Sequence, residues 1–128
     1  MSDNEEIENI IRDMCDKNYA LGLQHMDEQS IFIRPSGNPL NIEGWKSMMT
    51  SEDVIVEKND LISINKLYIN GNMAFVCYTT HGKFNYKGTE NDDIAVLTSI
   101  LEKKNKTWKI LLSQRSTGRT PNDELPKF

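Results

Sequence analysis

The second half of the chain consists of long runs of strand-forming residues separated by short polar turns. The most regular run is Thr107–Ser116, TWKILLSQRS, where large apolar side chains alternate with more polar ones. Successive side chains of a strand point to opposite faces of a sheet, so this run predicts one long strand with an apolar inner face. The expected inner face consists of Trp108, Ile110, Leu112 and Gln114.

Three further long strands are predicted before this one. Asn70-Gly71-Asn72 is a tight-turn signal between two apolar runs, and a lysine-rich turn precedes the last strand. The three predicted strands are Leu61–Ile69, Met73–Phe84 and Asn91–Glu102.

The first half of the chain is predicted to be mainly helical. Ser2 and Glu5 have the spacing of a capping box, and the apolar residues that follow recur at helical spacing on one face. Asn41 can cap a later helix. The expected elements are a helix to about Asn18 or Tyr19, a short helix through Leu21, Leu23 and Met26 after a break near Gly22, a short strand Ser30–Arg34, and a helix Ile42–Thr50.

Helices followed by a meander of long strands predict an α+β domain. In this arrangement a bent antiparallel sheet wraps around the N-terminal helices as a cone. We expect a single domain over residues 1–118. The last segment, 119–128, is rich in polar residues and contains two prolines, so we expect a surface tail there.

The overall charge excludes one broad class of function. The chain has 128 residues, a formal net charge of −4 and a pI near 5.2. A nucleic-acid binder needs clustered Lys and Arg to neutralise phosphates, so we expect no nucleic-acid partner. No apolar run has the length of a membrane span, and the N-terminus is acidic, so we expect a cytoplasmic protein without a membrane partner.

The two cysteines, Cys15 and Cys77, fall in a predicted helix and a predicted strand. Neither belongs to a CxxC pair or has a histidine at ligand spacing, so the sequence predicts no metal site and no disulfide framework. We expect two buried thiols and no cofactor.

Four segments carry a family resemblance. They are the helix pair, FIRPSGNPL leading into the Trp45 helix, the hairpin INGNMAFVCY and the ending LEKKNKTWKILLSQRS. From Glu5 to about Gly118 the chain resembles the nuclear transport factor 2-like superfamily, in its SnoaL-like branch. That branch includes ketosteroid isomerase, scytalone dehydratase, polyketide cyclases and the association domain of the calcium/calmodulin-dependent kinase. The resemblance implies the cone-shaped fold and a homodimer through the convex face of the sheet.

The resemblance does not extend to acid–base residues. In many relatives the last strand carries one or two histidines that move protons or hold a ligand. Counted from Trp108, those positions fall on Leu112 and Gln114, and neither side chain can transfer a proton. The kinase association domain also carries an arginine on the preceding strand, where this chain has Ser99.

If the family register holds, one face of Met73–Phe84 borders a pocket inside the cone. Its side chains are mostly apolar with a few neutral polar groups, a composition common in small-molecule sites, although the same side chains would also fill a core. The expected pocket residues are Met14, Tyr19, Trp45, Tyr78, Thr80, Leu97, Ser99, Leu112 and Gln114.

Candidates for catalysis are few. A buried Tyr78 phenol needs a hydrogen-bond partner and could orient a ligand carbonyl. An enzyme would also need a base, for which His81 and Asp93 are candidates, with Asp13 and Asp27 as further carboxyls. The alternative for Tyr78 is a place in a filled core. For His81 it is a surface or subunit-contact position, and for the carboxyls a solvated charge.

Arg34 and Arg115 are the candidate anion-binding side chains. Strand alternation places Arg115 on the face opposite Gln114. We therefore expect Arg115 to form an outward ion pair at a dimer surface.

Three functions are compatible with these observations. The first is a SnoaL-like protein that binds a small neutral organic molecule in the cone. The second is an isomerase, dehydratase or cyclase that uses Tyr78 with a carboxylate or His81, and the third is a non-catalytic oligomerisation module with a filled core. A fold of this kind hosts many functions, so the resemblance leaves enzyme activity open.

Overall fold

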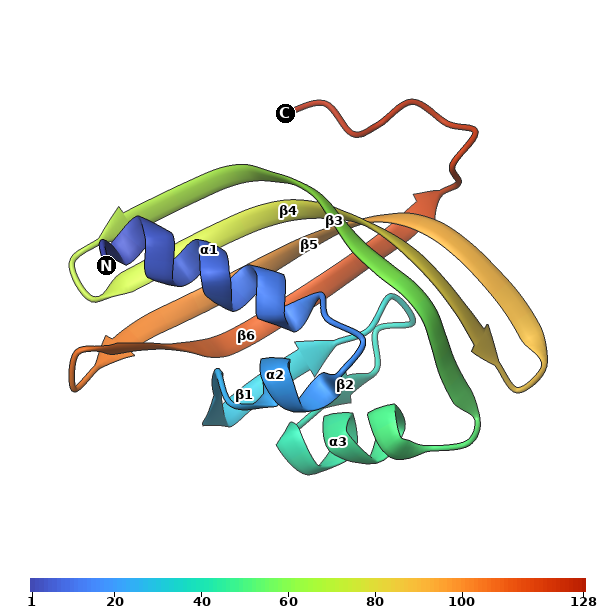
Figure 1. The fold of residues 1–128 in the computed structure, drawn as a ribbon, viewed down its shortest axis with the longest axis horizontal. Coiled ribbons are helices and arrows are strands. Elements are labelled where there is room, and N and C mark those ends of the chain that lie inside the picture. The colour runs from blue at the N-terminus through green and yellow to red at the C-terminus, as the bar shows by residue number, and fades with distance from the viewer.

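The computed structural model describes residues 1–128 as one curved sheet with three helices (Figure 1). The helices are α1 (Asp3–Met14), α2 (Tyr19–Leu23) and α3 (Ile42–Thr50). The strands are β1 (Met26–Ile33), β2 (Pro39–Leu40), β3 (Val54–Asn70), β4 (Met73–Tyr86), β5 (Thr89–Lys104) and β6 (Thr107–Arg119). The expected α+β fold, with a curved sheet around N-terminal helices, is confirmed.

The six strands form a single sheet in the order β2-β1-β6-β5-β4-β3. All neighbours are antiparallel except β1 and β6, which run parallel. The expected turn at Asn70-Gly71-Asn72 joins β3 to β4, and Gly71 takes a positive φ of 61°, a conformation that glycine adopts without strain.

Helix α1 lies across the concave face of the sheet and forms one half of the core (Figure 1). Its apolar stripe of Ile7, Ile10 and Ile11 is almost completely buried. Each such side chain contributes about 1.5–3 kcal/mol when it leaves water, so this stripe fixes the helix against the strands. Its partners on the sheet are Ala74, Val76, Tyr78, Ala95, Leu97, Leu101, Trp108 and Ile110.

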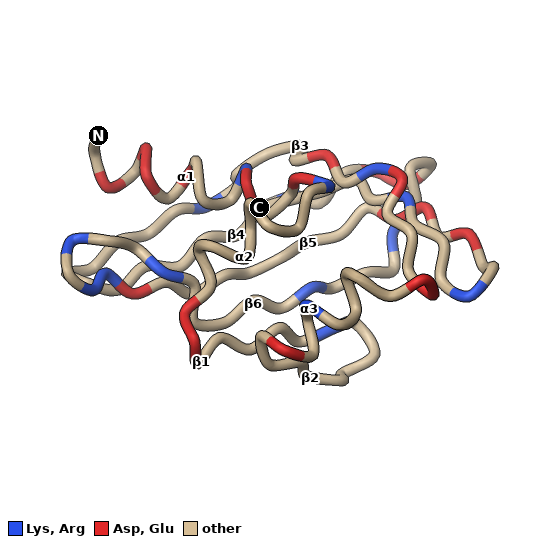
Figure 2. Tube along the Cα trace, turned by 60° about the horizontal axis from the view of Figure 1, so that its bottom comes forward, with Lys and Arg blue, Asp and Glu red and all other residues tan.

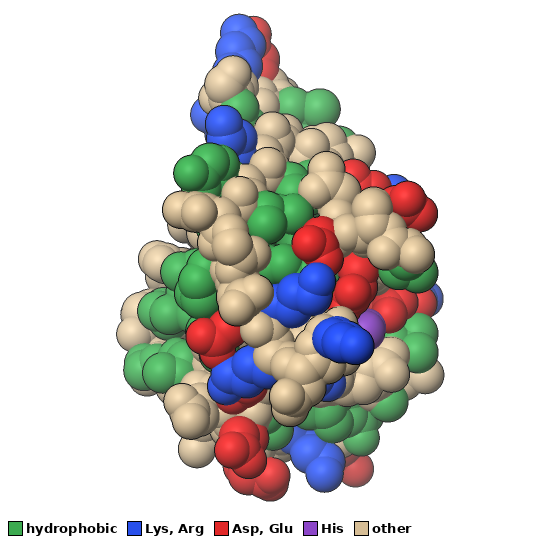
Figure 3. Space-filling model, turned by 90° about the vertical axis from the view of Figure 1, so that its left-hand side faces the viewer, with side chains coloured by type: hydrophobic (Ala, Val, Ile, Leu, Met, Phe, Trp, Pro, Cys, Tyr) green, Lys and Arg blue, Asp and Glu red, His purple; other side chains and the backbone are tan.

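The start of α1 is tied to the β5–β6 hairpin by hydrogen bonds to Trp108. The indole Nε1 donates to Asp3 Oδ1 at 3.0 Å, and the Trp108 backbone N–H donates to Glu6 Oε2 at 2.9 Å. Lys103 Nζ donates to the same Asp3 oxygen at 2.9 Å. Figure 3 shows acidic and basic side chains intermixed on this side of the molecule. These contacts join the first helix to the last strand.

The two N-terminal helices are shorter than predicted. Helix α1 ends at Met14, because Asn18 caps a new helix: its side-chain oxygen accepts from the Ala20 backbone N–H at 3.2 Å. Gly22 does not break α2 but allows it to approach α1, since a Cβ there would lie 2.9 Å from Met14 Sδ. The prediction for Ile42–Thr50 is confirmed, with Asn41 as its cap.

Strand β1 begins at Met26 and not at Ser30, although the sequence pattern predicts Met26 in the second helix. Pairing with β6 explains the difference, because Met26 lies opposite Ile110 in the parallel ladder. Strands β4, β5 and β6 also extend beyond their predicted bounds. Tertiary pairing, which local sequence does not encode, sets these ends.

A β-bulge at Leu111 reverses the two faces of β6. Leu101 pairs with Ile110 and Ile100 pairs with Leu112, so Leu111 is left unpaired. Before the bulge, Trp108 and Ile110 are buried as predicted; after it, Ser113 is buried and Gln114 is exposed. The prediction that Leu112 and Gln114 face the interior is therefore wrong, because it assumed unbroken alternation.

The segment after β6, residues 120–128, forms no helix or strand. In Figure 1 it runs outside the curved sheet to the C-terminus. Arg119 Nη1 donates to the Glu124 carbonyl at 2.9 Å, which holds the first part of this segment near the strand. None of the helices has the length and apolar composition needed to cross a membrane.

Asp3 is expected to stabilise the fold in a pH-dependent way. The hydrogen bonds from Trp108 and then Lys103 lower the pKa of Asp3 below its usual value of 3.8. A carboxyl with a lowered pKa in the folded state stabilises that state above its usual pKa and loses the effect as pH falls through the lowered value. Thermal unfolding followed by circular dichroism should therefore show Asp3→Asn with a lower Tm than the parent at pH 7, and the difference should shrink below pH 3.8.

The matched control is Glu8→Gln, another carboxyl on α1 but one outside the contacts with Trp108 and Lys103, and its Tm at pH 7 should be close to that of the parent. An Asp3→Asn difference that stays constant from pH 7 to pH 2.5 would contradict the assigned ionic contact.

Candidate functional site

The main cavity lies between α3 and the inner face of the sheet and has a volume of about 650 Å³. Strands β4, β5 and β6 form its floor, α3 covers it, and the segment from Phe32 to Asn38 closes one side. Half of the lining residues are hydrophobic. This size and composition are typical of sites for small organic molecules.

The cover of the cavity is apolar. Asn41 caps α3, and the helix then directs Trp45, Met48 and Met49 toward the sheet. Trp45 is buried and packs edge-on against Tyr19 of α2, with ring centroids 6.3 Å apart. Tyr19 thus supports the cover from behind and is not part of the cavity lining.

A chain of buried hydroxyls runs beneath one end of the cavity. The Tyr78 hydroxyl lies 2.9 Å from Ser99 Oγ, which lies 2.8 Å from Ser113 Oγ. All three residues are almost fully buried. Burial raises the pKa of Tyr78 well above its usual value, against the smaller effect of the Ser99 hydrogen bond. The phenol therefore stays protonated, and its hydroxyl already has a partner.

An ion pair lies at the other end of the floor. Arg115 Nη2 is 3.7 Å from Asp93 Oδ2, and both side chains line the cavity. Burial lowers the pKa of Arg115, and the charge of Asp93 opposes that change. Gly82, paired with Asp93 in the β4–β5 ladder, lies beside the guanidinium, and a Cβ on it would be in van der Waals contact with Arg115 Nη2 at 3.5 Å. The guanidinium also lies 5.4 Å from the centre of the Phe84 ring.

Thr80 provides a polar group that the protein does not satisfy. It lines the cavity, is 2% exposed, and its hydroxyl oxygen has no hydrogen-bond partner. A buried hydroxyl without a partner costs about 1–3 kcal/mol, so such groups are rare unless something else binds them.

The cavity also contains two further cationic side chains. Arg34 follows β1 and Lys58 belongs to β3, and both line the wall. Figure 2 shows where the basic and acidic positions lie along the Cα trace. The cavity lining therefore combines three cationic side chains, Arg34, Lys58 and Arg115, with one carboxylate, Asp93.

The structure brings together five of the predicted pocket residues. Met14, Trp45, Tyr78, Thr80 and Leu97 all line the cavity. Ser99 lies behind Tyr78 as its hydrogen-bond partner. Leu112 and Gln114 lie on the opposite face of the sheet, as a result of the bulge at Leu111.

Among the catalytic candidates, only Tyr78 and Asp93 line the cavity. His81 lies on the outer face of β4, where its Nε2 is 2.6 Å from Asp92 Oδ1. Asp13 is bound to His25, whose Nε2 is 2.7 Å from Asp13 Oδ2.

The last candidate carboxyl, Asp27, accepts hydrogen bonds from Lys104 Nζ at 3.2 Å and from the Gln29 backbone N–H. Hydrogen bonds from Gln29 and then Lys104 lower its pKa, against a raising effect of burial.

Arg34 and Arg115, the candidate anion-binding side chains, both line the cavity, together with Lys58, which the sequence did not single out. The expected outward position of Arg115 is wrong, because the bulge turns it inward opposite Leu97. Phe32, Met48 and Met49 were missed as lining residues as well. The helical spacing of Trp45, Met48 and Met49 predicted a shared apolar face, but not which empty volume that face covers.

The buried thiol of Cys15 also borders the cavity. Burial raises its pKa to about 12, so the thiol remains protonated and is a poor nucleophile. No cluster of three or more His, Cys, Asp or Glu side chains is arranged to hold a metal ion.

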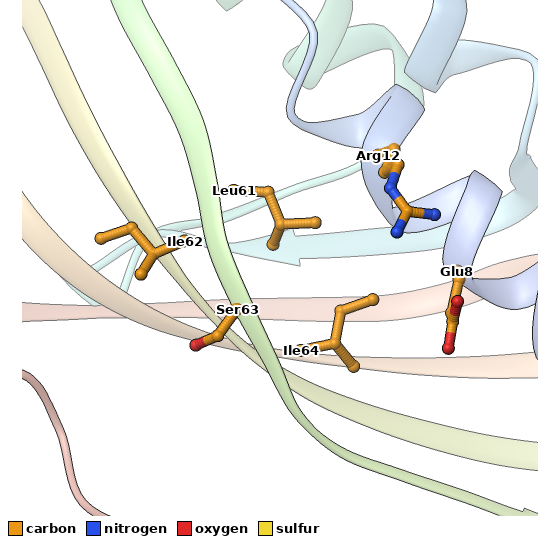
Figure 4. A pocket seen from close by; sticks show the side chains of 6 residues that line it. All are labelled: Glu8, Arg12, Leu61, Ile62, Ser63 and Ile64. Carbon is orange, nitrogen blue, oxygen red and sulfur yellow. The ribbon is translucent and has the colours of Figure 1, made fainter.

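A second depression of about 410 Å³ lies between α1 and β3 (Figure 4). Figure 4 shows Leu61 and Ile64 extending toward α1, while Ile62 lies on the other side of β3. Glu8 and Arg12 form its edge on α1. Leu61 and Ile64 pack against the core, so this depression is an open junction between helix and strand and carries no set of converging polar groups.

A family model described as "Protein of unknown function (DUF3804)" matches residues 2–123. Among solved structures, an NTF2-like protein of unknown function from Prochlorococcus is 36% identical, with a TM-score of 0.84 over 94% of this chain and 96% of that one. No curated protein matches the sequence.

More distant structures share the fold. A putative calcium/calmodulin-dependent kinase II association domain from Exiguobacterium sibiricum is 13% identical, with a TM-score of 0.78 over 93% of this chain and 95% of that one. A ketosteroid isomerase-like protein from Erwinia carotovora atroseptica is also 13% identical, with a TM-score of 0.73 over 91% of this chain and 93% of that one. At this identity the similarity concerns the fold alone.

The buried hydroxyl chain is expected to contribute to stability. Tyr78→Phe removes the hydroxyl that meets Ser99 but leaves Ser99 paired with Ser113, so we expect a loss of about 0.5–1.5 kcal/mol in the free energy of unfolding. Urea unfolding followed by fluorescence would measure it. The control, Tyr86→Phe at an exposed position, should change stability by less than about 0.5 kcal/mol. Equal effects of the two variants would argue against the assigned role of the chain.

Proposed function

We propose that this chain, which belongs to the DUF3804 family of proteins of unknown function and to the nuclear transport factor 2-like superfamily, binds a small organic molecule in the cavity beneath α3. The observation that carries the proposal is the cavity itself, about 650 Å³ in volume and bordered by Trp45, Met48 and Met49. A module whose core is filled would not retain such a volume, because protein interiors pack to high density.

The proposal favours binding over catalysis because the candidate catalytic side chains that line the cavity already have partners within the protein. General acid–base catalysis needs a group that can reach the substrate and exchange a proton near neutral pH. The Tyr78 hydroxyl is occupied by Ser99, and Asp93 is paired with Arg115. His81 lies on the outer face of the sheet. Neither Tyr78 nor Asp93 is thus arranged as a free donor or base.

We also propose that the protein forms a homodimer through the outer, convex face of the sheet. One row of paired residues crosses five strands on that face, and every member is apolar. The row consists of Ile31, Leu112, Ile100, Phe75 and Tyr68. Ile31 is 41% exposed and Tyr68 49% exposed. A continuous apolar row of this kind favours association, and association domains are among the structural neighbours.

Ligand binding can be tested with N-phenyl-1-naphthylamine, a neutral fluorescent probe whose emission rises in apolar sites. We expect saturable binding to the parent protein. Gly82→Leu should weaken it about tenfold or more, because the new side chain extends into the cavity without a backbone clash. Fluorescence titration measures both.

Lys83→Leu is the matched control, since it introduces the same side chain one position along β4 on the opposite face. It should leave the probe affinity unchanged. No binding to the parent, or equal binding to Gly82→Leu, would refute the cavity as a ligand site.

The dimer can be tested by placing a charge in the apolar row. Leu112→Glu should raise the dimer dissociation constant about tenfold or more, because an unpaired carboxylate would be buried at the interface. Sedimentation velocity over a range of concentrations would measure this. Ser116→Glu, exposed on the same strand and outside the row, should have little effect. A parent protein that is monomeric at micromolar concentration would contradict the proposal.

A further inference from the structure

We infer that the molecule held in the cavity is an organic carboxylate, whose two oxygens accept hydrogen bonds from the guanidinium of Arg115. This inference rests on the proposed function and adds the chemical class of the ligand. The sequence predicts a neutral ligand, from an apolar lining with a few neutral polar groups, and it places Arg115 outside that lining. With Arg115 inside, the character of the site changes.

The first supporting observation is the charge of the cavity. The chain as a whole carries a net charge of −4, yet the cavity lining has three cationic side chains and a single carboxylate. Lys58 Nζ forms an ion pair with Asp60 Oδ2 at 3.4 Å, and Asp60 is not part of the cavity lining. Arg34 Nε donates a hydrogen bond to the backbone carbonyl of Asn38 at 3.3 Å, which is a neutral acceptor. The lining therefore carries more positive charge than its own carboxylate can balance.

The second observation is the incomplete pairing of Arg115. A guanidinium carries five N–H donors in a planar fork. The single acidic contact of Arg115 is Asp93 at 3.7 Å, which is longer than the roughly 3.2 Å limit of a good N–H···O hydrogen bond. The side chain is nevertheless only 17% exposed. A mostly buried guanidinium with unused donors has a strong requirement for an acceptor.

The third observation is the hydroxyl of Thr80. It lies on the same face of β4 as Gly82, two residues away, and Gly82 is where the guanidinium rests. Its hydroxyl oxygen is buried and has no hydrogen-bond partner within the protein. Two residues of the lining, Arg115 and Thr80, thus have donors without a good acceptor in the protein.

These groups favour a carboxylate over a phosphate. Two parallel N–H···O bonds from one guanidinium match the planar geometry of a carboxylate. A phosphate dianion would be placed beside Asp93, whose negative charge repels the larger charge more strongly. The apolar cover formed by Trp45, Met48 and Met49 suits the hydrocarbon part of such a molecule.

The experiment compares two probes of the same size that differ in the head group, the anionic 3-phenylpropanoate and the neutral 3-phenylpropanamide. Each is titrated as a competitor of N-phenyl-1-naphthylamine at low ionic strength. We expect the carboxylate to bind about tenfold or more tightly than the amide, because hydrogen bonds to charged groups are the stronger ones.

Two variants test the assigned residues. In Arg115→Gln the carboxylate and the amide should bind with about equal affinity. The control Arg12→Gln, which replaces an exposed arginine on α1, should keep the preference for the carboxylate unchanged. Asp93→Asn should increase carboxylate affinity severalfold with little effect on the amide, because it removes the negative charge beside Arg115. The Asp93 variant keeps the test decisive if the Arg115 variant does not fold.

The outcomes separate the two proposals. If the neutral fluorescent probe binds but the carboxylate shows no advantage over the amide, this inference is overturned and the binding function stands. An advantage that Arg115→Gln leaves intact, or that Asp93→Asn reduces, also overturns it. If none of the three probes binds, the binding function and this inference both fail.

Discussion

The unpaired residue at Leu111 determines what the interior of this protein contains. A strand that alternated without interruption from Trp108 would direct Leu112 and Gln114 inward and would leave the floor of the cavity without the Arg115 guanidinium. The bulge keeps Trp108 and Ile110 in the core and then turns Ser113 and Arg115 toward the inside. It thereby supplies the last member of the buried hydroxyl chain and the guanidinium of the cavity, while Leu112 joins the apolar row on the outer face.

The polar groups inside the sheet fall into two sets with different consequences. Tyr78, Ser99 and Ser113 satisfy one another, so their hydrogen bonds are complete within the protein. Thr80 and Arg115 have donors that no protein acceptor satisfies. A complete network makes the core specific, whereas an incomplete one next to an empty volume selects what can enter it.

The architecture could be predicted from sequence because its determinants are local and repeated: the helical stripe around Ile7, the alternation from Trp108, and the turn at Gly71. The core positions of the cavity, Tyr78, Thr80 and Leu97, followed from the same alternation on unbulged strands. Arg115 did not, because the TWKILLSQRS run contains no glycine or proline that marks Leu111 as the extra residue. The roles of Asn18 and Gly22 depend on contacts between helices, which no local pattern encodes.

The attachment of α1 to Trp108 has a consequence for the order in which the protein folds. The hydrogen bond from the Trp108 indole to Asp3 joins residues 105 positions apart in the chain. The first helix leaves the ribosome before its docking surface exists, since that surface requires the last hairpin. Closing so long a loop is entropically costly, so topology favours slow folding with α1 docking onto an assembled sheet as a late step. Until then its apolar stripe is accessible to chaperones.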